Sequence, residues 1–118
     1  MKKTKPLLGP LPVEARSKSK GGMKTTYLTL LTFTDLGLRN IAQSPQRAAA
    51  WRRQAEAAGV IVVAQLWTTG AYDGVLILEG DSEEQILRAL TQLDAGGNVR
   101  THSLRALQAE DFERVIRS

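Results

Sequence analysis

Strand-like and helix-like segments alternate in a fixed order from residue 25 to the end of this 118-residue chain. Runs of β-branched, aromatic and aliphatic residues predict strands at 26–33, 60–67, 72–79 and 98–107. Helical spacing predicts one helix between the first two strands, a second between the last two, and a short one at 109–117. The order β-α-β-β-α-β predicts an α+β, ferredoxin-like fold: a four-stranded antiparallel sheet with two helices on one face, followed by a short C-terminal helix.

Local signals mark where these helices begin and end. Ser44 followed by Pro45 is typical of a helix start, and Gly59 of a helix end. Asp81 resembles the first residue of a capping box for the second helix. The stretch Thr34-Asp35-Leu36-Gly37 is predicted as a turn. We expect the C-terminal helix to bury its three large apolar residues, Phe112, Val115 and Ile116.

Positive charge is concentrated at the start of the chain. Residues 1–24 hold every lysine and carry seven basic residues against one acid, whereas the remainder carries nine arginines against eleven acids. We therefore predict a disordered basic leader at 1–23 and a globular domain at 24–118. Gly21-Gly22 precedes Met23 directly before the first strand, so we expect that translation starts naturally at Met23. Because the domain itself is acidic, nucleic-acid binding is not expected.

Composition excludes several chemistries. The chain has no cysteine and a single histidine, so it has no disulfide, no thiol nucleophile and no His-rich metal site. No phosphate loop is present, and we predict neither a metal nor a cofactor. No apolar stretch approaches the ~20 residues of a membrane helix, and the start of the chain does not resemble a signal peptide. A cytoplasmic location without membrane contact is predicted.

The second and third strands are apolar at both alternating sets of positions. In the second strand, one set is Val60, Val62, Ala64 and Leu66, and the other is Ile61, Val63, Gln65 and Trp67. An antiparallel sheet with one face in water would alternate apolar and polar residues. Because two helices cover only one face, we predict that a second copy of the chain covers the other in a homodimer or higher homo-oligomer. The alternative is that the C-terminal segment folds over part of the sheet.

Three separate blocks, TDLGLRNIAQSPQRA, WTTGAYD and GNVRTHSLRA, together resemble the GYD domain family. The Gly-Tyr-Asp signature of this family corresponds here to Gly70, Tyr72 and Asp73. The resemblance covers nearly all of residues 25–115 and implies a ferredoxin-like protein related to the dimeric α/β-barrel superfamily. It also implies homo-oligomers, and it leaves the activity open.

Two residues of the signature are the first candidates for a site. If Tyr72 and Asp73 are successive in a strand, their side chains face opposite ways and do not act as one pair. Tyr72 is then buried with Leu76 and Leu78. Asp73 needs a partner on a buried face. The candidate partners are Arg39, Arg100 and Arg105.

The remaining candidates come from the ends of other segments. We expect Trp67 to lie near Tyr72 across the turn, and Arg39-Asn40 is a possible anion site. His102 shares a face with Arg100, which disfavours the protonated imidazole. Each residue also has a structural interpretation, as core, surface or loop-fixing residue. The candidate ligand-binding residues are Trp67, Tyr72, Arg39 and Arg100.

Two functions fit these observations. The first is a homo-oligomeric assembly or binding module with a small apolar ligand held between two sheets. The alternative is a cofactor-free enzyme, an oxygenase or isomerase of the dimeric α/β-barrel kind. Its acid–base residues would be His102, Tyr72 and Asp73.

Overall fold

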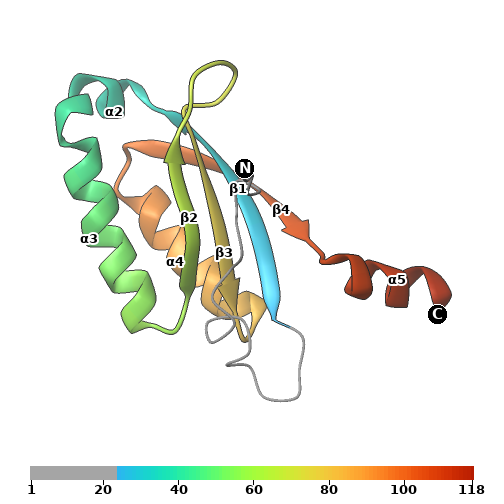
Figure 1. The fold of residues 1–118 in the computed structure, drawn as a ribbon. Helices are drawn as coiled ribbons and strands as arrows, with labels where there is room; N and C mark the ends of the chain where they lie inside the picture. The colour runs from blue at the N-terminus through green and yellow to red at the C-terminus, as the bar shows by residue number, and fades with distance from the viewer. Residues whose placement is uncertain (1–23) are drawn as a thin grey trace, which may run out of the picture.

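The computed structural model describes residues 24–118, which form a four-stranded sheet with helices on one side (Figure 1). The strands are β1 (Thr25–Phe33), β2 (Ile61–Trp67), β3 (Gly74–Gly80) and β4 (Val99–Ala106). The helices are α2 (Asp35–Arg39), the 3-10 turn η1 (Ile41–Gln43), α3 (Ser44–Ala57), α4 (Glu83–Ala95) and α5 (Ala109–Arg117). The ferredoxin-like fold is confirmed. The predicted leader, with the start at Met23, lies outside the described residues.

The strand order is β2-β3-β1-β4, and every neighbouring pair is antiparallel, so β2 and β4 form the two edges. Helices α3 and α4 cover one face, which we call the helix face (Figure 1). We call the other the open face. Alternation along the paired strands assigns its residues. They include Leu28, Leu30, Leu66, Val75, Ile77, His102 and Leu104.

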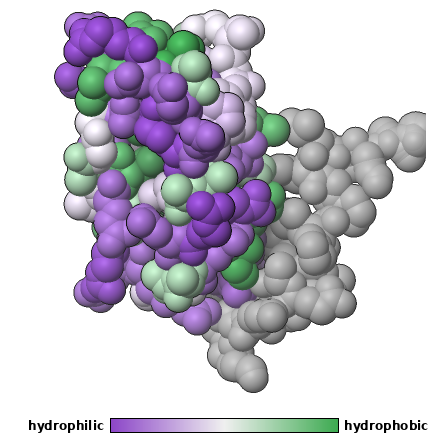
Figure 2. Space-filling model, turned by 90° about the vertical axis from the view of Figure 1, so that its left-hand side faces the viewer, coloured by the Kyte–Doolittle hydropathy of each residue, from purple (hydrophilic) through white to green (hydrophobic). Residues whose placement is uncertain are grey.

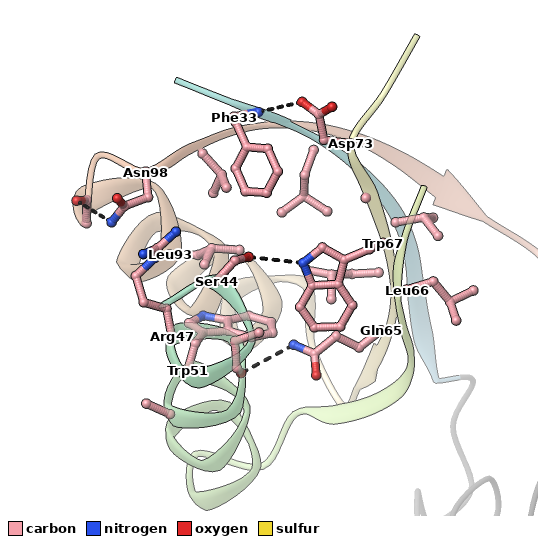
Figure 3. Close-up of a pocket in the computed structure, with 18 of the residues that line it drawn as sticks. Phe33, Ser44, Arg47, Trp51, Gln65, Leu66, Trp67, Asp73, Leu93 and Asn98 are labelled. Carbon is pink, nitrogen blue, oxygen red and sulfur yellow. Dashed lines mark hydrogen bonds between the residues drawn. The ribbon is translucent and has the colours of Figure 1, made fainter. Parts of the chain in front are cut away.

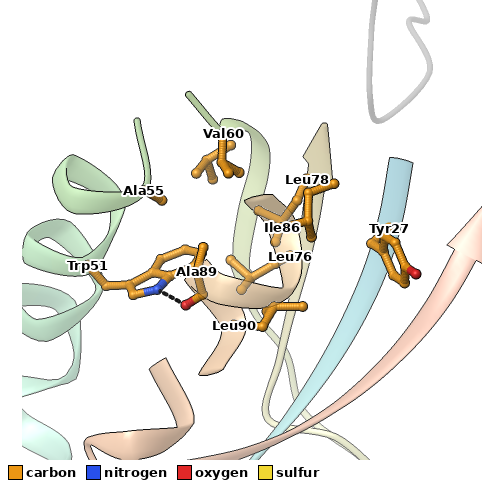
Figure 4. Close-up of a cluster of buried hydrophobic side chains, with 10 residues drawn as sticks. Tyr27, Trp51, Ala55, Val60, Leu76, Leu78, Ile86, Ala89 and Leu90 are labelled. Carbon is orange, nitrogen blue, oxygen red and sulfur yellow. Dashed lines mark hydrogen bonds between the residues drawn. The ribbon is translucent and has the colours of Figure 1, made fainter. Parts of the chain in front are cut away.

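The core lies between the helix face and the two long helices (Figure 4). Trp51 of α3 is buried, and its indole Nε1 donates a hydrogen bond of 2.8 Å to the carbonyl of Ala89 in α4. This bond joins the two helices over the sheet. The other buried apolar residues are Tyr27, Ala55, Val60, Val62, Leu76, Leu78, Ile86 and Leu90.

An irregularity in β2 breaks the strict alternation that the sequence predicted. Val62 lies opposite Leu78 and Gln65 opposite Leu76, with one extra residue between them. This β-bulge places Val62 and Gln65 on the same face, although a regular strand would separate them. The end of β2 is therefore turned so that Gln65 donates to the Ala48 carbonyl of α3, at 3.3 Å.

The helix starts differ from the predictions in detail. Ser82, not Asp81, caps α4, because its hydroxyl accepts a hydrogen bond of 3.2 Å from the Gln85 amide. The predicted turn after β1 is the short helix α2, capped by Thr34. Ser44 is the first residue of α3 and not its cap, since no side-chain cap hydrogen bond forms there.

Helix α5 forms where it was predicted, but the expected burial is wrong. Phe112, Val115 and Ile116 are 54%, 56% and 65% exposed. Figure 1 shows α5 projecting beyond β4, away from the sheet. Ion pairs within the helix, such as Arg117–Glu113 at 3.3 Å, support it locally. The helix therefore presents an apolar side that nothing covers in the described part of the chain.

Candidate functional site

A cavity of about 280 Å³ lies on the helix face, between α3 and the adjoining ends of the strands (Figure 3). Its wall is mainly apolar, and Trp51 and Trp67 both line it. The polar lining residues come from α3 and α4, from the end of β2 and from the loops before β3 and β4. They include Ser44, Arg47, Gln65, Asp73 and Asn98.

Trp67 is held in place by α3. Its indole Nε1 donates a hydrogen bond of 3.0 Å to Oγ of Ser44, which is buried, while the Trp67 side chain remains half exposed at the cavity. The β-bulge in β2 sets this orientation, because it turns the end of the strand toward the helices. The turn keeps the backbones of Trp67 and Tyr72 close, because the Thr68 hydroxyl donates a hydrogen bond of 2.7 Å to the Tyr72 carbonyl. The Trp67 indole itself is directed toward Ser44 on the helix face.

Asp73 fastens the loop before β3 to the end of β1. Its Oδ2 accepts a hydrogen bond of 2.8 Å from the Phe33 amide, and its own amide donates to the Leu31 carbonyl at 2.8 Å. The Thr68 amide donates to the Asp73 carbonyl at 2.9 Å, which closes the β2–β3 connection. The partner of this carboxylate is thus a backbone amide, and the predicted arginine partner is wrong.

Tyr72 faces a different neighbour. Tyr72 and Asp73 both precede β3, so the strand alternation that predicted burial of Tyr72 with Leu76 and Leu78 does not extend to it. The half-buried Tyr72 ring instead lies 6.5 Å from the His102 ring, at an interplanar angle of 54°. Because β1 separates β3 from β4, this contact bridges the end of β1.

The acid–base residues of the enzyme hypothesis are therefore divided. Tyr72 and His102 meet, whereas the Asp73 carboxylate bonds to Phe33 and lines the cavity. Neither Tyr72 nor His102 lines that cavity. A proton-transfer site needs its groups within hydrogen-bond reach of one substrate position. The three residues do not form such a site within the described protomer.

The arginines named from the sequence lie elsewhere. Arg39 ends α2 and is exposed, and Arg100 is exposed on β4. Neither lines the cavity. The sequence reasoning missed Arg47, which does. Helical spacing could have identified Arg47, because Ser44, Arg47 and Trp51 recur at the intervals of one side of a helix.

One buried ionisable group has a structural partner. The Tyr27 hydroxyl donates a hydrogen bond of 2.7 Å to Oε2 of Glu83. This bond, together with desolvation of the ring, raises the pKa of Tyr27 above its ordinary value. Tyr27 therefore joins β1 to the first turn of α4 as a neutral donor.

Within residues 24–118 no group of histidines and carboxylates has the arrangement of a metal site. No helix among the same residues has the length and apolar character needed to cross a membrane.

The fold and the Gly70–Asp73 loop define a small ferredoxin-like protein with a GYD signature. The family model for the GYD domain matches residues 27–116, so the chain belongs to the GYD domain family. A curated relative from Thermus thermophilus is 33% identical over 88 residues, which are 74% of this chain and 93% of the relative. That protein is named glutamine synthetase and cystathionine beta-lyase binding protein. The comparison with solved structures gave no significant match.

Proposed function

We propose that this chain is a protein-binding module that assembles with itself through the open face and, in that form, binds a larger enzyme. The observation that carries the proposal is that no helix of residues 24–118 covers the open face of the sheet. In this described part of the chain, α3 and α4 cover the helix face (Figure 1), and α5 projects away from the sheet instead of folding back over the open face.

The residues of the open face suit contact with another protein. Leu28, Leu30 and Ile77 form an apolar strip across the central strands. Toward the edges, Leu66 and Leu104 are 41% and 51% exposed. At about 25 cal/mol per Å² of apolar surface, burying about 500 Å² of such a face contributes about 12 kcal/mol before association costs.

A second copy of this chain is the occupant we propose for the open face. A two-fold axis brings the same apolar strip of both protomers together, so that one interface covers both. Each protomer also contributes one α5, whose apolar side is exposed within residues 24–118. Exposed Glu110 in its first turn complements exposed Arg100 on β4, whereas Asp111 beside it is paired with Arg114 of the same helix.

The outer surface over α3 is a poorer interface. Figure 2 views this side and shows mainly hydrophilic colours, with the hydrophobic ones gathered toward the upper end, at the level of α2 and η1. At that end Leu36, Leu38 and Ile41 are 40%, 53% and 50% exposed. This end remains accessible in a sheet-to-sheet dimer, and we propose it as the contact for the enzyme partner.

The name of the Thermus thermophilus relative supplies the first partners to test, a glutamine synthetase and a cystathionine β-lyase. The cytoplasmic location predicted from the sequence is part of this proposal.

The test is binding of immobilised chain to each purified enzyme of the same organism, measured by biolayer interferometry. We expect saturable binding of at least one enzyme by the wild type. Leu104→Asp, which places a charge on the open face, should weaken that binding by about tenfold or more through loss of the bivalent dimer. Leu87→Asp is the matched control, because Leu87 lies on α4 and is 43% exposed. Absence of binding to both enzymes would contradict the proposal.

A further inference from the structure

Arg47 is a cation at an apolar cavity, and no ion pair of its guanidinium is found among the described residues. The side chain is half-buried and lines the cavity. Its Nη1 donates a hydrogen bond of 2.8 Å to the Asn40 carbonyl. Four guanidinium N–H donors are left. A partly desolvated guanidinium without a counter-charge is unfavourable, and a carboxylate is the group that matches its fork of donors.

A second hydrogen-bond donor lies on the same side of α3 as Arg47. Ser44 Oγ already accepts the indole N–H of Trp67 and is buried, so its own O–H is left to donate. Figure 3 shows Ser44 and Arg47 both rising from the start of α3. Arg47 and Ser44 therefore place two donors close together along α3, whereas the amides of Gln65 and Asn98, which also line the cavity, already donate to backbone carbonyls.

The two charged side chains at the cavity, Arg47 and Asp73, favour one orientation of a charged ligand within it. The Asp73 carboxylate lies at the far side in Figure 3, where it accepts the Phe33 amide. Like charges repel, so an anionic group of a ligand is disfavoured near Asp73 and favoured near Arg47. An apolar body then fills the space that Trp51, Trp67 and Leu93 line.

The volume of the cavity limits the size of the apolar part of a ligand. Its volume of about 280 Å³ lies just below the range of about 300–1,000 Å³ typical of ligand pockets. An apolar cavity of about 150 Å³ is enough to hold benzene. One ring or a branched chain with a short acidic group therefore fits.

We propose that this cavity binds a small carboxylate with an apolar body, whose carboxylate pairs with Arg47 and accepts a hydrogen bond from Ser44. The apolar body packs against the Trp67 indole, which the bond to Ser44 holds in place. The site lies within one protomer and depends on neither the dimer nor an enzyme partner.

The chain contains two tryptophans, and both line the cavity, so intrinsic fluorescence reports on it directly. The probes are benzoate, phenylacetate and 4-methylpentanoate, each titrated beside its neutral amide. We expect a saturable fluorescence change with at least one carboxylate. We also expect about tenfold or more weaker binding of its amide, as a charged hydrogen bond predicts. The Trp67 indole N–H resonance should shift in the same titration.

Substitutions separate the site from its surroundings. Arg47→Gln should weaken carboxylate binding by about tenfold or more, and Arg47→Lys, which keeps the charge but loses the fork, should weaken it less. Arg53→Gln is the control, because Arg53 lies exposed on the same helix and does not line the cavity. The Leu104→Asp variant should bind the probe as the wild type does. The proposed ligand site can therefore be tested even if the proposed dimer and enzyme binding fail.

Three results would overturn the proposal. They are no saturable change with any of the three carboxylates, equal affinity for a carboxylate and its amide, or unchanged binding after Arg47→Gln.

Discussion

At the scale of single residues, Asp73 shows how a family signature can be structural. Its carboxylate and backbone together hold the β2–β3 connection against the end of β1. The ring of Tyr72, the preceding residue, faces the His102 ring over the intervening strand β1. The signature thus places one side chain at the cavity and its neighbour near β4.

The hydrogen bond from Phe33 to Asp73 predicts different costs for two substitutions. Asp73→Ala leaves the Phe33 amide without an acceptor and should lower the free energy of unfolding by about 1–3 kcal/mol. Asp73→Asn keeps an acceptor oxygen, so it should cost less, about 1 kcal/mol or below. Urea denaturation measures both. An equal loss in the two variants would instead indicate that the carboxylate's charge matters, as in an ion pair.

At the scale of elements, α2 packs against the connection between α4 and β4 with almost no clearance. A Cβ added at Gly37 would lie 2.0 Å from the Asn98 carbonyl oxygen. The same contact region contains the hydrogen bond of 2.6 Å from the Thr34 hydroxyl to the Gly97 carbonyl. Only glycine lets the two segments approach so closely.

Gly37→Ala should therefore destabilise the protein strongly, by about 2–3 kcal/mol or more, because backbone must move to relieve the overlap. The control is Gly96→Ala, where the nearest atom to an added Cβ is 3.4 Å away and φ is −67°. That variant should be as stable as the wild type or slightly more so. Thermal melts followed by circular dichroism measure both, and a tolerated Gly37→Ala would contradict this packing.

The type of each element could be predicted from the sequence, but two details of their geometry could not. Strand and helix types were predictable, because period and capping residues are local signals. The β2 bulge was not, because Val62 and Val63 are equally apolar and no pattern marks an extra residue. The path of α5 was not predictable either, since an amphipathic helix does not specify what its apolar side contacts.

The candidate site was predictable only in part, for the same physical reasons. Trp67 was named from the sequence, but its bond to Ser44 depends on a tertiary contact between β2 and α3. The partner of Asp73 is a backbone amide, and every residue except proline has one, so no residue type identifies it. Arg47 was not predicted as a site residue, because an arginine on a helix usually faces water.

At the scale of the whole molecule, the two faces of the sheet are unequal. The helix face is covered by α3 and α4, whereas the open face keeps an apolar strip without a helix in the described part of the chain. Both edge strands carry a leucine that is more than 40% exposed, Leu66 on β2 and Leu104 on β4. This inequality is the basis of the proposed assembly.

The most direct measurement is the mass of the full chain in dilute solution by sedimentation velocity. We predict at least twice the protomer mass of 12.9 kDa at micromolar concentration, a shift toward 12.9 kDa for Leu104→Asp, and no shift for Leu87→Asp. A wild-type chain that sediments at 12.9 kDa under these conditions would contradict the account.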